Sequence, residues 1–116
     1  MSITRYEAGK RMSQAVVHGN TVYLAGQVAT DYNGTIEKQT TEVLAAVEKL
    51  LVQAGTSKAK LLSIQVVLNN IADFAAMNSV YDMWIDPANP PTRACIEARL
   101  AHPALKVEVI AVAALD

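Results

Sequence analysis

Two residues near the end of the chain have the chemistry to bind and activate a small acid. Arg93 lies in the segment Pro90–Cys95 and Glu108 in the segment Lys106–Val109. A guanidinium can donate two parallel hydrogen bonds to a carboxylate, and a partly buried glutamate can orient water or relay a proton. The two prolines before Arg93 stiffen its approach to a strand. Taken singly, Arg93 also fits a surface arginine at a strand end. Glu108 also fits an interface ion pair, with Lys106 or an arginine of another subunit.

Cys95 and the two histidines are weaker candidates. Cys95 is two residues after Arg93, so on a strand the two share a face. No histidine lies on a recognisable partner element, which favours Cys95 as a small buried hydrophobe over a nucleophile. His18 and His102 each lack a second ligand at metal-binding spacing, so no metal site is expected.

Composition limits the class of protein. The chain has 116 residues, is 52% hydrophobic and carries a formal charge of −1. We expect residues 1–116 to form a single domain with too much apolar surface for a monomer, and hence an oligomer. The charge gives no basic footprint for nucleic acid. One cysteine, no apolar leader and no long apolar run predict a cytoplasmic protein without a membrane anchor.

The first half of the chain predicts a hairpin followed by a helix. Two apolar runs, Ser13–His18 and Thr21–Gly26, flank the dipeptide Gly19-Asn20, which suits a tight turn. Apolar residues then recur at helical spacing over residues 38–54, and Gly55 is a typical helix stop.

The second half predicts another helix between strands. We expect this helix to run from Asp73, as N-cap, to Ile85, with an inward stripe of Phe74, Met77, Tyr81 and Trp84 that leaves Asn78 one position aside. Alternating residues predict strands over 62–68 and 93–100, with Leu62 on the better-buried face of the first. A continuous apolar run predicts a further strand over 105–115. The order β-β-α-β-α-β-β predicts an α+β fold, one mixed sheet with two helices packed on one face. We expect another copy of the chain to cover the other face.

Four segments, in this order, resemble the reactive intermediate deaminase (Rid) family, also called YjgF or L-PSP. They are the hairpin Ser13–Gln27, the helix Asp73–Asn78 with Tyr81, the motif Pro91-Thr92-Arg93-Ala94-Cys95 and the strand Lys106–Val109. The resemblance spans essentially the whole chain. It implies a chorismate-mutase-like fold and a homotrimer with ligand clefts between subunits.

The resemblance also implies an activity and a set of site residues. The activity is cofactor-free hydrolysis of enamine and imine intermediates, such as 2-aminoacrylate and 2-iminobutanoate, to 2-oxo acids and ammonia. It makes Arg93 the substrate-binding arginine and Glu108 the water-orienting glutamate. Cys95, Asn78 and Gly26 are then substrate-binding residues of the cleft.

Three positions depart from the family pattern. Met12, Ala25 and Ile110 stand where the family usually has a tyrosine, a serine and a second acid. A less polar cleft is expected, which puts the identity of the substrate and the rate in doubt. Two alternatives to the deaminase stay open. One is a trimeric binder of small carboxylates without turnover. The other is an L-PSP-type endoribonuclease or translation inhibitor, against which the charge and the absence of a catalytic histidine pair both argue.

Overall fold

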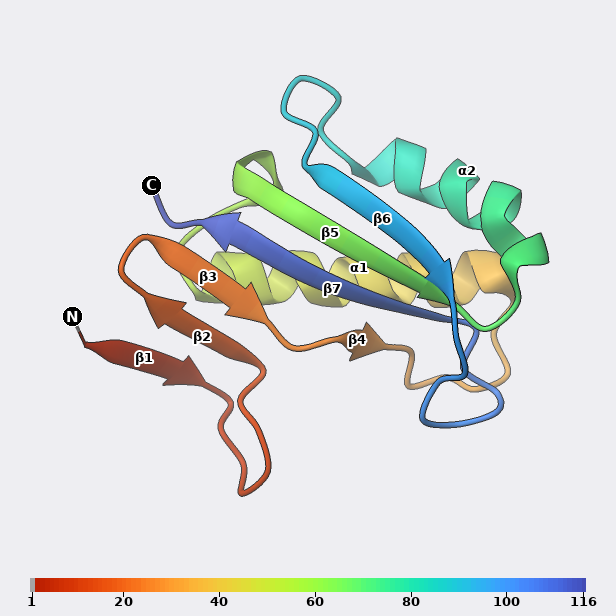
Figure 1. Cartoon of the computed structure of the whole chain (residues 1–116), viewed down its shortest axis with the longest axis horizontal. Coiled ribbons are helices and arrows are strands. Elements are labelled where there is room, and N and C mark those ends of the chain that lie inside the picture. The colour runs from red at the N-terminus through yellow and green to blue at the C-terminus, as the bar shows by residue number, and fades with distance from the viewer. Residues whose placement is uncertain (1) are drawn as a thin grey trace.

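A computed structural model describes residues 2–116, which form one mixed sheet with two helices on one face (Figure 1). The molecule measures 42 × 37 × 19 Å, as expected of two layers. The strands are β1 (Ile3–Tyr6), β2 (Ala15–His18), β3 (Thr21–Leu24), β4 (Gln27–Val28), β5 (Leu61–Leu68), β6 (Thr92–Glu97) and β7 (Val107–Ala114). The helices are α1 (Ile36–Gln53) and α2 (Phe74–Trp84). The predicted fold class is confirmed.

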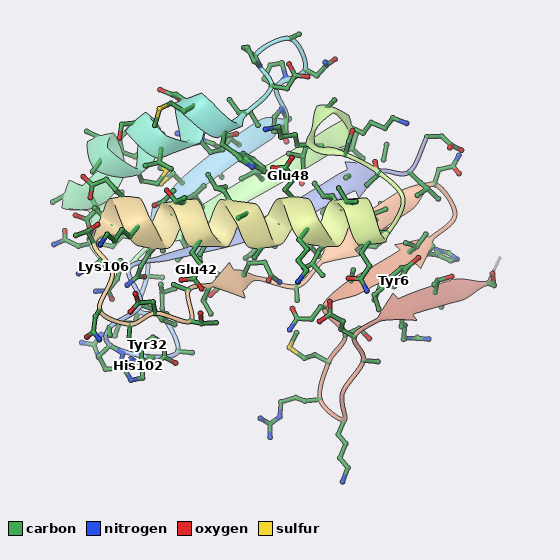
Figure 2. The ribbon with its side chains drawn as sticks, turned by 180° about the vertical axis from the view of Figure 1, so that it is seen from behind. Tyr6, Tyr32, Glu42, Glu48, His102 and Lys106 are labelled. Carbon is green, nitrogen blue, oxygen red and sulfur yellow. The ribbon has the colours of Figure 1, made fainter. Side chains whose placement is uncertain are left out.

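The strand order places β6 at one edge of the sheet and β7 near its middle. The order is β1-β2-β3-β7-β5-β6, and β4 pairs with the part of β7 that β3 leaves free. Only β5 and β6 are parallel, and α2 forms the crossover between them. Figure 2 shows the helical side, with α1 lying across the sheet.

Helix α1 begins and ends close to the predicted residues. Thr35 accepts a hydrogen bond from the backbone N–H of Lys38, which satisfies one of the free donors of the first turn. Gly55, at φ 94°, takes the left-handed conformation that commonly follows a helix.

Helix α2 begins differently from the prediction. Asp73 occupies the N-cap position, but its side chain makes no capping hydrogen bond. Instead the side chain of Asn70 accepts from the N–H of Ala72 and caps a short 3-10 turn, Ile71–Asp73, that leads into α2. The inward stripe is only partly buried: Met77 and Tyr81 lie in the core, whereas Phe74 is 41% exposed.

The strands follow the predicted alternation in part: β6 ends at Glu97, short of residue 100, and β7 begins at Val107 rather than at residue 105. The hairpin turn is present, with Gly19 at φ 61°. The short strands β1 and β4 were not predicted. In β5 the pairing with β7 shifts between Leu61 and Ser63, so Leu61 is buried and Leu62 is 50% exposed. The expectation that Leu62 shares the buried face of β5 is therefore wrong, because such a shift reverses the direction of side chains on one side of it.

The two faces of the sheet have different surroundings. In β7, Val107, Val109, Ala111 and Ala113 are buried under the helices, and the residues between them face the other way. In the described part of the chain, residues 2–116, no helix covers that other face, here called the open face (Figure 1). It includes large apolar side chains, with Tyr23 49% and Ile96 44% exposed. Among residues 2–116, no helix combines the length and apolarity needed to cross a membrane.

Candidate active site

Arg93 lies on the helix-covered face, at the edge of the sheet. Its register partner in parallel β5 is the buried Ile64, so both side chains point toward the helices. The Nη1 of Arg93 donates to the Oδ1 of Asn78 at 2.6 Å. Its Cζ lies 4.7 Å from the ring centroid of Tyr81 and 5.8 Å from that of Phe74. Helix α2 therefore contacts the guanidinium in two ways: the Tyr81 ring packs against its face, and Asn78 accepts one of its hydrogen bonds.

This arrangement leaves several N–H donors of Arg93 unused. Arg93 is exposed, and its bond to Asn78 uses one of several N–H donors. The remaining donors can take a carboxylate in bidentate geometry. The Tyr81 ring is buried, which raises the pKa of its phenol above the ordinary value, with the nearby Arg93 acting in the opposite direction. Tyr81 is therefore a neutral ring under a cation.

Cys95 lies on the same face as Arg93, as predicted. It pairs with the buried Val66 and packs, half-buried, against the core. Burial raises the pKa of its thiol, an effect that the positive charge of Arg93 only partly opposes. A protonated thiol is a poor nucleophile at neutral pH. This favours the interpretation of Cys95 as a small hydrophobe.

Glu108 lies on the open face. Its register partners are Val67 in β5 and Val28 in β4. The carboxylate is half-buried against Gly26, and a Cβ atom at position 26 would overlap it. Within residues 2–116 no hydrogen bond or ion pair engages this carboxylate, so it is free to bind water or a ligand.

One chain does not bring Arg93 and Glu108 together. Arg93 is directed toward the helices and Glu108 toward the opposite side of the sheet. The sequence motifs predicted that both residues line one cleft, but not which subunit supplies each residue. Within one subunit the two side chains therefore extend to opposite faces of the sheet.

The positions that depart from the family pattern lie in separate places. Met12 is exposed in the loop between β1 and β2. Ile110 lines a groove of about 510 Å³, together with Gln65, Ala94 and Val112 of the open face and with Arg93 at the sheet edge. Ala25 directly precedes Gly26, so it lies near Glu108.

Two features of the site were missed in the sequence. Phe74 and Tyr81 were assigned to the core, yet both contact the guanidinium of Arg93. Their spacing to Asn78 is the signal that was available, since residues three and four apart share a helix face. The second feature is Gln39, which is buried. It donates to the carbonyl of Ala104 and accepts from the N–H of Lys106, which fixes the segment that leads into β7.

A metal centre has no basis in the described part of the chain. Across residues 2–116, no group of three or more His, Cys, Asp or Glu side chains is placed to hold an ion. His102 instead accepts from the N–H of Ala104 through Nδ1 and stacks on Tyr32 with ring centroids 4.1 Å apart. Figure 2 shows the two rings side by side, below helix α1.

Comparison with known proteins identifies the family. The sequence profile described as Endoribonuclease L-PSP matches residues 2–115. A RutC family protein of Haemophilus ducreyi is 41% identical over 114 residues, which cover 98% of this chain and 97% of that protein. The RutC family protein YoaB of Escherichia coli is 36% identical over 115 residues, covering 99% and 100%. A crystal structure of a YjgF family member from Neisseria meningitidis, 35% identical, superposes with a TM-score of 0.97 over 100% of this chain and 97% of that one. The chain belongs to the RutC/YjgF/L-PSP family, as the sequence motifs predicted.

Proposed function

We propose that this protein is a cofactor-free hydrolase that converts small 2-imino acids to 2-oxo acids and ammonia. The observation that carries the proposal is the mounted guanidinium of Arg93, with Asn78 beside it, Tyr81 beneath it and donors left free. Such a group selects a carboxylate by geometry as well as by charge. A single cysteine with a protonated thiol suits the reducing cytoplasm, where we place the protein.

The site requires a second subunit, and the surface of the chain supports one. The open face combines apolar side chains with the free carboxylate of Glu108. Strand β6, which carries Arg93, is an edge strand. In a homotrimer, the β6 edge of one subunit can pack beside the open face of the next, which places Arg93 of one chain opposite Glu108 of its neighbour. The ligand cleft is then an inter-subunit one.

The chemistry follows from these two groups. The substrate carboxylate binds Arg93, which leaves the C=N carbon toward the neighbouring Glu108. The carboxylate of Glu108 accepts a proton from water as the water oxygen adds to that carbon, and it passes this proton to the imine nitrogen to give the carbinolamine. Glu108 then takes the hydroxyl proton as the C=O bond forms and delivers it to the nitrogen, which leaves as ammonia when the C–N bond breaks. An enamine joins the same path after protonation of its β-carbon.

The direct test is ammonia release from 2-iminobutanoate generated in situ. The proposal predicts release faster than the spontaneous rate and in proportion to protein concentration. Arg99→Ala is a matched control, since Arg99 is an exposed arginine beyond the end of β6. Ammonia release at the spontaneous rate at all protein concentrations would contradict the enzyme.

A second candidate is a binder of small carboxylates without turnover. Ile110 favours this second candidate, because it puts an apolar residue where the family usually has a second acid, on the face that carries Glu108. Titration with 2-oxobutanoate separates the candidates. Saturable binding together with the spontaneous rate of ammonia release would identify the binder, and binding with acceleration would identify the enzyme.

A further inference from the structure

The ring of Tyr81 lies under the guanidinium that the proposed function uses. The distance from Cζ of Arg93 to the ring centroid is 4.7 Å, within the range of a cation–π contact. Tyr81 is 7% exposed, and its neighbours in the core fix the ring. The ring is therefore a rigid support, whereas Arg93 is an exposed side chain with many rotamers.

Asn78 fixes the remaining freedom of the guanidinium. A ring beneath a planar cation sets its height and tilt but leaves it free to turn in its own plane. The 2.6 Å bond from Nη1 to the Oδ1 of Asn78 opposes that turning. Both residues come from the rigid helix α2, and Asn78 is half-buried.

We propose that Tyr81 and Asn78 are positioning residues that hold Arg93 in the orientation that receives a carboxylate. This inference deepens the proposed function and takes from it only the identity of the ligand. Tyr81 acts through its ring and not through its hydroxyl, which makes no hydrogen bond within residues 2–116. Asn78 acts through Arg93 rather than by contact with the ligand.

Substitutions at position 81 separate the ring from the hydroxyl. Tyr81→Leu removes the support and leaves Arg93 to be ordered by the ligand. Ordering one long side chain weakens binding of 2-oxobutanoate by about 3- to 10-fold. The conservative Tyr81→Phe keeps the ring and rescues the affinity. In turnover, Tyr81→Leu raises KM more than it lowers kcat, because the lost orientation affects ground-state and transition-state binding alike.

Two further variants distinguish a loss of Arg93 orientation from a general loss of stability. Asn78→Ala removes the in-plane bond without opening the core and is expected to weaken binding in the same direction. Met77→Ala opens a cavity in the same helix at a fully buried residue. It is expected to lower the melting temperature without changing affinity. An equal loss of affinity in Met77→Ala and Tyr81→Leu would overturn the proposal.

A measurement without ligand tests the proposal independently of the reaction. NMR of the 15N-labelled guanidinium of Arg93 reports rotation about its Nε–Cζ bond. We expect slow rotation and separate Nη signals in the wild type and in Tyr81→Phe, and averaged signals in Tyr81→Leu and Asn78→Ala. Averaged signals in the wild type, or slow rotation in Tyr81→Leu, would overturn the proposal. Slow rotation in a protein that does not bind 2-oxobutanoate would instead contradict the proposed function alone.

Discussion

Arg93 and Glu108 extend from opposite faces of the same sheet, Arg93 toward α2 and Glu108 onto the open face. Within a single chain the sheet separates the two side chains. A catalytic site that contained both residues would therefore be formed by two subunits. The apolar composition predicts an oligomer, whereas the positions of Arg93 and Glu108 predict in addition that catalysis depends on the oligomer.

Removing the guanidinium tests the carboxylate fork. Arg93→Ala is expected to weaken binding of 2-oxobutanoate by about 10- to 100-fold, the effect of losing a charge-assisted hydrogen bond. Arg93→Lys keeps the charge but loses the planar fork, so it should recover only part of the affinity. Isothermal titration measures both, with Arg99→Ala as control. Unchanged affinity in Arg93→Ala would place the carboxylate elsewhere.

Replacing the free carboxylate tests its part in the rate. Glu108→Gln is nearly isosteric and cannot accept the proton, so kcat should fall by about 10²- to 10⁴-fold while much of the affinity for 2-oxobutanoate remains. Glu37→Gln, an exposed residue in the first turn of α1, is the control. A normal rate in Glu108→Gln, or its dissociation into monomers, would make Glu108 a structural residue.

The contact between Gly26 and Glu108 predicts an effect of one methyl group. In Gly26→Ala the new Cβ overlaps the carboxylate of Glu108, and the flexible end of that side chain must move away. We expect a clear loss of kcat with little change in melting temperature. Gly9→Ala, in the loop between β1 and β2, meets only the backbone oxygen of Met12 at 3.8 Å and serves as control. Normal turnover in Gly26→Ala would show that the position of the carboxylate is unimportant.

Glu42 predicts a dependence of stability on pH. Hydrogen bonds from the hydroxyl and backbone N–H of Thr30, both at 2.6 Å, hold the pKa of this carboxyl below its ordinary value. A group with a lowered folded-state pKa stabilises the fold above its unfolded pKa, and this contribution is lost as pH falls through the folded value. Figure 2 shows Glu42 on α1, next to the segment after β4.

Thermal melts of Glu42→Gln and wild type test this expectation. The variant should be less stable at pH 7, and the difference should shrink as pH falls below about 4. A constant difference from pH 7 to pH 3 would contradict the assigned role of the carboxylate.

The sequence predicted most of the fold because most of its elements have strong periodic patterns. Helix α1 and strand β7 bury whole faces, so their spacing is distinct. Strands β1 and β4 were missed because one is short and mostly exposed and the other has two residues. The shift after Leu61 was also missed, since alternation alone does not reveal where a strand changes register.

The site was only partly predictable for a related reason. Arg93, Asn78 and Glu108 were identified by residue type and motif, whereas the contacts of Tyr81 and Phe74 depend on how α2 crosses over β6. The separation of Arg93 and Glu108 depends on strand register. Arg93 pairs with Ile64 of β5 and Glu108 pairs with Val67, and these two β5 residues lie on opposite faces because side chains alternate along a strand.

Subunit complementation tests the shared site most directly. Arg93→Ala and Glu108→Gln chains are unfolded together in equal amounts and refolded, and ammonia release is measured at a substrate concentration at which each variant alone is slow. In random mixed trimers, about a quarter of the interfaces combine an intact Arg93 from one chain with an intact Glu108 from its neighbour. The account predicts that about this fraction of wild-type ammonia release returns, and that mixing either chain with the double variant restores none. Mixed assemblies with a mass near three chains of 12.5 kDa that remain inactive would contradict it.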